Sequence, residues 1–250
     1  MSERQILLEA RGVCKYFAGL KAVEAVDMQV REGDVFGIIG PNGAGKTTFF
    51  NCCTGIYPAT KGEVYFQGER ITRMTPEQIA RRGVTRTFQN IQLFKFMSVL
   101  DAVLHTPRYR RDEKYAVERS LEVLNDIGMY DVRDTMAGTL PYGMQRKVEI
   151  ARALALEPKL LLLDEPAAGM NPLETQSLME FIKMLNGKGY SILVIEHDMK
   201  FVMNACNRIL VLNFGQKIAE GTPEEIRANE QVREAYFGKG LIVEGVSQDA

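Results

Sequence analysis

A glycine-rich turn between an apolar run and a helix constrains the fold of this chain more than any other segment. The turn is Gly40-Pro41-Asn42-Gly43-Ala44-Gly45-Lys46-Thr47, and it fits the phosphate-loop pattern G-x-x-x-x-G-K-[ST] directly after the apolar residues 35–39. Its glycines let the backbone curl so that successive N–H groups point inward, and the helix starting near Gly45 adds its positive end. Lys46 can reach the β- and γ-phosphates, the Thr47 hydroxyl is placed to bind Mg²⁺, and Thr48 extends the nucleotide contact. The turn predicts a site for a nucleoside triphosphate, and the strand before it weighs against a chance match.

A second apolar run ends in two acidic residues. Residues 160–163 are four leucines, and they are followed by Asp164, Glu165 and Pro166. Such a run is typical of a central parallel strand that is buried on both faces, and ligands bind at the carboxyl ends of these strands. Asp164 is then a ligand for the metal, directly or through water, and Glu165 is a base for the attacking water. The alternative is a buried strand with solvated acids at its end, which the phosphate loop makes the weaker interpretation.

Three further motifs occur in a fixed order. Gln89 follows a short Val-Thr strand, and His197 ends the apolar strand 192–195 after Glu196. The segment Leu140-Pro141-Tyr142-Gly143-Met144-Gln145-Arg146 opens a helix over 147–156. Together the motifs resemble those of the nucleotide-binding subunits of ATP-binding cassette (ABC) transporters, from about residue 7 to residue 238. Within that superfamily the chain looks most like the ATPase subunits of bacterial branched-chain amino-acid importers. The segments that carry this likeness are 86–89, 165–172, 195–200 and 220–226.

The resemblance implies a role for each of these residues. Gln89 corresponds to the Q-loop glutamine, whose amide meets both Mg²⁺ and the attacking water, and His197 to the switch histidine that contacts the γ-phosphate. Phe17 aligns with the aromatic residue that stacks on adenine, with Tyr16 as the competing candidate. Stacking on a base contributes about 1–3 kcal/mol in nucleic-acid complexes. His105, the other histidine, has no comparable setting and is interpreted as ordinary.

The signature segment departs from the family pattern. Pro141, Tyr142, Gly143 and Met144 stand where the family motif, usually beginning Leu-Ser-Gly-Gly-Gln, binds the nucleotide held by the opposite subunit. Tyr142 is frequent in the branched-chain relatives. Pro141 has neither a hydroxyl nor an N–H, whereas the family's serine donates to the γ-phosphate. The structural interpretation of Pro141 is that it starts a helix. Asn171, where many cassettes have Asp, is shared with the branched-chain relatives.

Composition restricts the partners. The formal net charge is −1, so no electrostatic footprint for nucleic acid is present. The densest basic cluster is interpreted as a solvated face: Arg108, Arg110, Arg111 and Lys114. The four cysteines have no C-x-x-C spacing, which argues against zinc and a disulfide framework. No signal segment and no apolar run of about 18 residues is found, so other chains must form any membrane path.

The pattern predicts an α/β fold with an ABC-type P-loop ATPase core, a mixed sheet, an antiparallel β layer and an inserted helical lobe. Residues 1–90 and 158–250 form the core, and residues 91–157 form the lobe that carries the signature. Strands are expected over 7–12, 23–30 and 61–67 in the β layer, and over 209–213 and 217–220 later. Helices are expected over 99–104, 115–127, 172–187 and 223–228.

The resemblance implies an ATP-hydrolysing subunit that drives import of leucine, isoleucine and valine through separate permease subunits. It places the chain peripherally on the cytoplasmic face of the inner membrane. There the chain would pair head to tail with a second ABC ATPase subunit, and a paralogue is favoured over a second copy. A periplasmic amino-acid-binding protein is the expected indirect partner. ATP and Mg²⁺ are the expected cofactors. One alternative is a soluble ABC ATPase without a transport role; the single cassette and the short insertion after Gln89 weigh against it. Another is a non-catalytic ATP-binding regulator, which only Pro141 suggests.

The segment after Gln89 is rich in large apolar side chains. In the family this region forms part of the groove that receives a permease helix, and Phe94 or Phe96 is predicted to line it, because aromatic residues are common interface anchors. Burial within its own lobe is the alternative.

Overall fold

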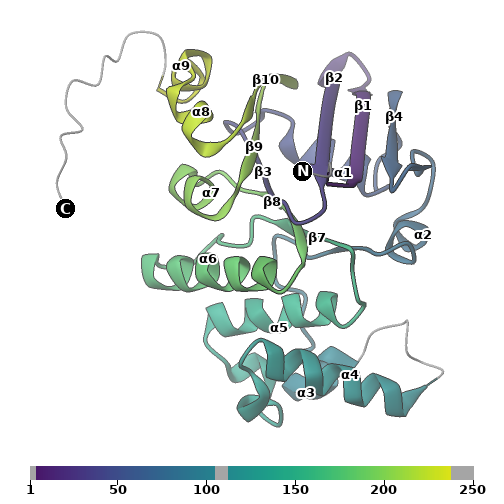
Figure 1. Cartoon of the computed structure of the whole chain (residues 1–250), viewed down its shortest axis with the longest axis vertical. Coiled ribbons are helices and arrows are strands. Elements are labelled where there is room, and N and C mark those ends of the chain that lie inside the picture. The colour runs from purple at the N-terminus through teal and green to yellow at the C-terminus, as the bar shows by residue number, and fades with distance from the viewer. Residues whose placement is uncertain (1–3, 105–111, 238–250) are drawn as a thin grey trace, which may run out of the picture.

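Short apolar strands form the centre of the molecule, in a six-stranded sheet of order β10-β9-β3-β8-β7-β6 (Figure 1). The computed structural model describes residues 4–104 and 112–237, so His105, Arg108, Arg110 and Arg111 lie outside the described residues. The sheet is mixed, because β10 pairs antiparallel with β9 while the other pairs are parallel. Its strands are β3 (Val35–Ile39), β6 (Val84–Arg86), β7 (Leu160–Asp164), β8 (Ser191–Ile195), β9 (Arg208–Asn213) and β10 (Gln216–Gly221).

Alternate residues of the central strands pack against opposite layers. Leu161 and Leu163 of β7 belong to an apolar cluster with the helices that follow, whereas Leu160 and Leu162 belong to a second cluster with the antiparallel strands and α1 (Lys46–Cys53). All five residues of β7 are buried. Burial on both faces explains why these strands are continuous apolar runs rather than alternating ones.

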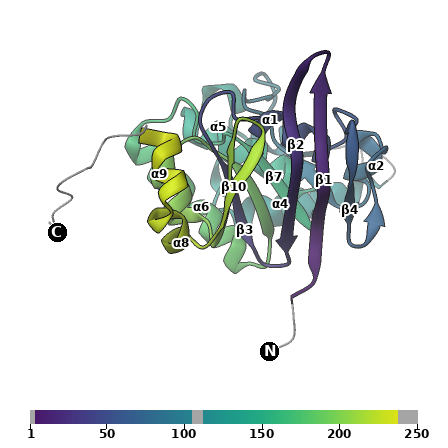
Figure 2. The same cartoon turned by 90° about the horizontal axis from the view of Figure 1, so that it is seen from above.

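The antiparallel layer is a four-stranded sheet of order β2-β1-β4-β5, seen beside the central sheet in Figure 2. Its strands are β1 (Ile6–Phe17), β2 (Leu20–Arg31), β4 (Lys61–Phe66) and β5 (Glu69–Arg70). The strand predicted over 7–12 continues to Phe17, because register shifts near Gly12, at φ 54°, let β1 bend without ending. This extension carries Phe17 to the end of the strand.

Helices cover the other face of the central sheet and form a lobe at one end. The helices are α2 (Pro76–Ala80), α3 (Val99–Leu104), α4 (Glu113–Asp126), α5 (Tyr142–Leu154), α6 (Pro172–Gly187), α7 (Met199–Ala205), α8 (Pro223–Ala228) and α9 (Glu230–Phe237). α3, α4 and α5 lie together at the end of the molecule opposite the antiparallel sheet (Figure 1). One apolar cluster joins Val99 of α3 and Val148 of α5 to Val35 of the central sheet. The lobe therefore packs directly on the core, and its limits at residues 91 and 157 stay a prediction.

The signature helix begins earlier than expected. α5 starts at Tyr142, not at residue 147, and Pro141 is its N-cap with φ −52° and ψ 150°. The interpretation of Pro141 as a helix-starting residue agrees with this geometry. As a consequence, Tyr142, Gly143 and Met144 form the first turn of the helix rather than a loop before it.

Candidate functional site

The phosphate loop joins the buried strand β3 to α1, and close backbone contacts determine its path. A Cβ atom on Gly40 would collide with the carbonyl oxygen of Leu212, and one on Gly45 with that of Ala22. Gly43 and Gly45 have φ values of 80° and 92°, which only glycine adopts at little cost. The loop is therefore held between β9 and β2, while Asn42, Gly43 and Thr47 remain accessible at its rim.

Lys46 is folded back onto the loop. Its side chain is buried, and Nζ donates to the carbonyl oxygens of Gly40 at 2.6 Å and Pro41 at 3.0 Å. Burial lowers the pKa of Lys46, while the nearby carboxylates of Glu165 and Glu196 oppose that shift. A phosphate entering the loop would supply the anion that this buried ammonium lacks among its direct partners.

The carboxyl ends of β6, β7 and β8 bring the three predicted catalytic side chains together. Gln89 donates from Nε2 to Oε2 of Glu165 at 2.8 Å, and His197 Nδ1 lies 3.9 Å from the same oxygen. Glu165 itself has φ 44°, and its N–H donates to the carbonyl of Ile195 at 2.9 Å. A non-glycine residue in this conformation is strained, which is common at functional sites. The side chains of Glu165 and His197 are 19% and 56% exposed, so water can reach the cluster.

Asp164 has a partner that the sequence did not reveal. Arg86, at the end of β6, donates from Nη2 to Asp164 Oδ2 at 2.8 Å and from Nη1 to Asn51 Oδ1 at 2.7 Å. The guanidinium also lies over the ring of Phe50, 4.7 Å from its centroid. Arg86 stands three residues before Gln89, but only the pairing of β6 with β7 shows that it faces the acid.

The predicted metal ligands have the types of oxygen atom that Mg²⁺ binds in proteins. Thr47, Gln89 and Asp164 offer a hydroxyl, an amide oxygen and one carboxylate, and Mg²⁺ is typically held by one or two carboxylates together with nucleotide phosphates and water. Thr47 is exposed at the start of α1, and Asp164 has one oxygen paired with Arg86. The donor set therefore suits a hard cation that arrives with the phosphates.

Glu196 is a further buried carboxylate that the sequence did not single out. It is fully buried at the end of β8; Oε1 accepts from the N–H of Ala167 at 2.8 Å, and Oε2 accepts from the N–H of His197 at 3.2 Å. Burial raises its pKa, although both backbone hydrogen bonds favour the charged form. Glu196 thus ties the loop after Glu165 to the backbone of His197.

Phe17 suits the adenine-stacking role better than Tyr16. Phe17 is 40% exposed, and its ring packs edge-on against Tyr57 with centroids 5.4 Å apart. Lys15 Nζ lies 4.9 Å from the same ring centroid. The Tyr16 hydroxyl is instead engaged with Glu24 at 2.9 Å. An exposed ring braced from its edge can present a face to a base.

The signature residues are not part of this chain's own cluster. Pro141 and Tyr142 are exposed at the start of α5, and Tyr142 and Gly143 lie beside Gly169 and Glu174, respectively. Pro141 offers no side-chain hydrogen bond to the helix. An exposed signature is available to a second molecule.

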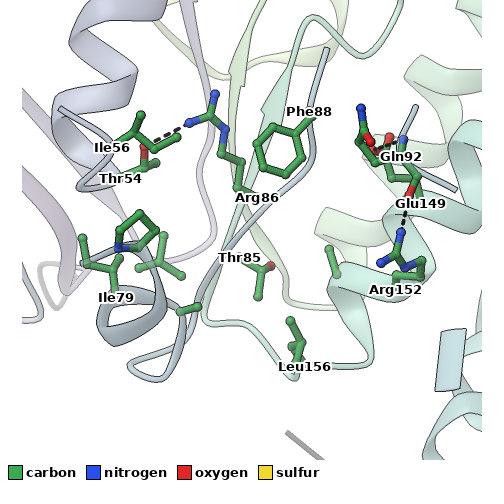
Figure 3. A pocket seen from close by; sticks show the side chains of 14 residues that line it. Thr54, Ile56, Ile79, Thr85, Arg86, Phe88, Gln92, Glu149, Arg152 and Leu156 are labelled. Atoms are coloured by element: carbon green, nitrogen blue, oxygen red, sulfur yellow. Dashed lines mark hydrogen bonds between the residues drawn. The ribbon is translucent and has the colours of Figure 1, made fainter. Parts of the chain in front are cut away.

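A groove of about 290 Å³ opens between the core and the helical lobe (Figure 3). Phe88 projects across its middle, with Ile56 and Ile79 of the core on one side and Arg152 of α5 on the other (Figure 3). Phe94 and Phe96 are not among the residues that line this groove, and their predicted contact with a permease helix stays a prediction. Phe94 instead packs with Arg152, whose guanidinium lies 5.4 Å from its ring centroid, and Phe96 is 94% exposed. Gln92, from the same segment, does line the groove.

Comparisons with known proteins agree with this geometry. A family model described as "ABC transporter" matches residues 23–168, and one described as "Branched-chain amino acid ATP-binding cassette transporter" matches residues 216–241. The chain is 44% identical to the high-affinity branched-chain amino acid transport ATP-binding protein BraF of Pseudomonas aeruginosa, over 93% of this chain and 98% of that protein. It is 42% identical to the protein LivG, of the same description, of Escherichia coli K12, over 94% and 99% of the two chains.

A solved structure agrees as well. The crystal structure of a nucleotide-free ATP-binding cassette from an ABC transporter superposes with a TM-score of 0.84 at 34% identity, covering 94% of this chain and all of the other. In the described part of the present chain, no helix combines the length and apolarity that a membrane crossing requires.

Proposed function

The chain belongs to the ATP-binding cassette family of transporter ATPases, and from that premise we propose that it hydrolyses ATP to drive import of branched-chain amino acids through separate membrane subunits. The observation that carries the chemistry is the convergence of Gln89, Glu165 and His197 at the strand ends beside the phosphate loop. The match of residues 216–241 to the branched-chain family model, together with the named relatives, supports branched-chain amino acids as the transported substrates.

Each residue of the cluster has a step that its chemistry supports. The phosphate loop and Lys46 bind the β- and γ-phosphates, and Phe17 stacks on adenine. Glu165 takes the proton of the attacking water, Gln89 orients that water from its position against Glu165, and His197 donates to the γ-phosphate. Mg²⁺, with Thr47, Gln89 and Asp164 as its protein ligands, would neutralise charge on the phosphates.

The exposed signature completes the site of a second cassette. In a head-to-tail pair, Pro141, Tyr142, Gly143 and Met144 of this chain face the nucleotide on the partner's phosphate loop. Because Pro141 lacks the hydroxyl that would donate to that nucleotide, we favour a paralogue that brings an intact serine to this chain's own site. A paired arrangement also explains why the signature of a single chain lies away from its own catalytic cluster.

The transporter needs partners that this chain does not contain. The groove between core and lobe, with Phe88 at its centre, is the surface that we assign to the permease subunits. The other expected partner is a periplasmic amino-acid-binding protein that delivers cargo to the permease. The chain would then act peripherally at the cytoplasmic face of the inner membrane.

The direct test of the chemistry is Glu165→Gln in the assembled transporter. The amide keeps the shape of the side chain and removes the proton acceptor, so hydrolysis should fall at least about 10²-fold while Mg²⁺-ATP affinity is retained. Lys46→Ala should instead weaken nucleotide binding, and the exposed Glu118→Gln is the matched control that should change neither. Near wild-type turnover of Glu165→Gln would remove Glu165 from the role of base.

A further inference from the structure

A second cavity, away from the nucleotide cluster, lies among the three helices α7, α8 and α9. Its volume is about 320 Å³, within the range of small-molecule sites. The three helices are stacked at the side of the molecule away from the α3–α5 lobe (Figure 1). Neither the phosphate loop nor the groove beside Phe88 contributes to its lining.

The walls of this cavity combine apolar and cationic side chains. Met203, Ile226 and Tyr236 are among its apolar lining residues, and Ile226 is 1% exposed. Lys200, Arg227 and Arg233 also line it, all three residues are exposed, and none forms an ion pair within residues 4–104 and 112–237. Long basic side chains of this kind lay their stems on apolar surface and keep their charged ends at the mouth of a cavity.

No acidic side chain balances these cations in the lining. The carboxylates of the neighbouring helices do not line the cavity: Glu225 accepts from the N–H of Thr222 at 2.8 Å in the cap of α8. Hydrogen bonds to its own backbone N–H and to Thr222 lower the pKa of Glu224, and the nearby cation of Arg227 lowers it further. An apolar interior with three positive charges at its mouth complements a ligand with an apolar body and a negative head group. An ammonium group on the ligand would be repelled, so the charge pattern disfavours a free amino acid.

The cavity adjoins the catalytic machinery through two of its walls. α7 begins two residues after His197, and Asp198 caps it by accepting from the N–H groups of Lys200 at 2.8 Å and Phe201 at 3.1 Å. Tyr236 of α9 lies on the other side: burial raises the pKa of its hydroxyl and the nearby backbone of Gly40, the first residue of the phosphate loop, opposes that rise, while the hydroxyl itself has no hydrogen-bond partner among the described residues. A ligand wedged among α7, α8 and α9 would therefore press on the segments that carry His197 and Gly40.

We propose that this cavity binds a small aliphatic carboxylate and that its occupancy changes the rate of ATP hydrolysis. The binding step stands on the cavity alone, whereas the effect on hydrolysis rests on the proposed function. Carboxylate binding is measured without nucleotide, and its effect on hydrolysis is measured with ATP. Each of the two steps can therefore be refuted separately.

Titration calorimetry on the full-length chain without nucleotide tests the binding step. 4-Methylpentanoate should bind, and both leucine and the neutral 4-methylpentan-1-ol should bind at least about tenfold more weakly, because one adds an ammonium and the other removes the charge. The affinities for hexanoate and 4-methyl-2-oxopentanoate are then compared. Tighter binding of hexanoate would indicate a straight-chain fatty acid as the ligand, and tighter binding of 4-methyl-2-oxopentanoate would indicate a deaminated amino acid. No heat with any carboxylate, or equal affinity for the alcohol, would overturn the proposal.

Variants then locate the site. Arg227→Ala combined with Arg233→Ala should weaken 4-methylpentanoate at least tenfold, whereas the matched control Lys183→Ala, an exposed cation on α6, should leave affinity unchanged. Met203→Trp should block the cavity, and the arginine pair keeps the test valid if that variant does not fold. Unchanged affinity in the arginine pair would place the ligand elsewhere and refute the site.

The regulatory step is tested in the assembled transporter. Saturating 4-methylpentanoate should change ATP turnover at least twofold, and the arginine pair should abolish this response without altering basal turnover. Binding with no change in turnover would refute the regulatory step and leave the site, while a transporter with no turnover at all would refute the proposed function and leave the binding result standing.

Discussion

Two buried carboxylates at neighbouring strand ends have opposite kinds of partner. Asp164 is paired with the guanidinium of Arg86, whereas Glu196 accepts hydrogen bonds from two backbone N–H groups and lies 3.7 Å from Nδ1 of His197. The difference follows from position, because β7 borders β6 and its arginine, while β8 lies between β3 and β7 in the middle of the sheet. Glu196 is therefore a buried carboxyl that connects two loops of the site through its backbone hydrogen bonds.

That setting predicts how Glu196 titrates. Burial raises the pKa of this carboxyl above its ordinary value of 4.5, so the folded chain binds a proton at pH values where the unfolded chain has lost it. Glu196 consequently lowers the free energy of unfolding as pH rises above about 4.5, and this contribution is recovered as pH falls back. Glu196→Gln lacks the titration, so the wild-type protein should gain stability relative to the variant between pH 7 and pH 5.

Urea unfolding at a series of pH values measures this difference. One unit of pKa shift corresponds to about 1.4 kcal/mol, which is well within reach of the method. The exposed Glu180→Gln is the control and should follow the wild-type profile. Parallel profiles for wild type and Glu196→Gln, or a relative loss of wild-type stability at pH 5, would disprove the raised pKa.

At the scale of elements, the start of α5 determines what the signature can do. Pro141 occupies the N-cap without a side-chain acceptor, although Ser is among the preferred residues there. Pro141→Ser should therefore stabilise the chain by roughly 0.5–2 kcal/mol and restore a donor to the partner's nucleotide. A charge-assisted hydrogen bond contributes about 1.5–3 kcal/mol, so the site on the partner's phosphate loop should accelerate by roughly 10- to 150-fold.

Two measurements separate the effects of Pro141→Ser. Unfolding of the isolated chain reports the cap, and hydrolysis in the complex, with each cassette's catalytic glutamate inactivated in turn, reports the donor. Acceleration only at this chain's own site, or none at either site, would refute the head-to-tail assignment.

The groove between core and lobe is the second element with a testable role. Cysteines at Ile56 and Gln92, both exposed in the groove, should crosslink to permease loops. Leu173→Cys, exposed at the start of α6 and not among the residues that line the groove, is the control and should not crosslink. The native cysteines at 14, 52, 53 and 206 are buried, which confines the reaction to the new ones. Crosslinks from Leu173 alone would place the permease on a different face.

Much of the fold could be predicted because its signals are local. The phosphate loop, the leucine strand and the helix over 172–187 each carry their pattern within a few residues, and the structure has β7 and α6 at those places. The bend of β1 at Gly12 and the early start of α5 at Pro141 could not be placed, because each depends on a neighbouring strand or on cap geometry. Glu165 could be named from its place at the end of the leucine strand, whereas Gln89 and His197 could be named through the resemblance to the cassette family.

The partners of those residues could not be predicted. Arg86 is far in sequence from Asp164, and Glu196 is far from Ala167, so only the sheet order β8-β7-β6 brings each pair together. The lining of the groove could not be predicted for the same reason: the path of the chain around Gln89 directs Phe88 and Gln92 into it, and not Phe94 or Phe96. Side-chain direction in an irregular segment has no periodic signal.

In the whole molecule, one cassette carries both a catalytic cluster and an exposed signature segment. The described part of the chain contains no membrane-crossing helix, and its signature is exposed for a partner. We propose that hydrolysis assisted by Glu165 moves branched-chain amino acids through other subunits. If the partner is the proposed paralogue with an intact signature serine, this chain's own site should carry most of the turnover.

Uptake of radiolabelled leucine into proteoliposomes tests this claim most directly. The vesicles contain the complete transporter, with the binding protein on one side and ATP on the cassette side, and the same assay is run with isoleucine, valine and an unrelated acidic amino acid. The account predicts ATP-dependent uptake of the three branched-chain amino acids, reduced at least tenfold by Glu165→Gln in this chain. Uptake that Glu165→Gln leaves intact, or hydrolysis that moves none of the three, would contradict it.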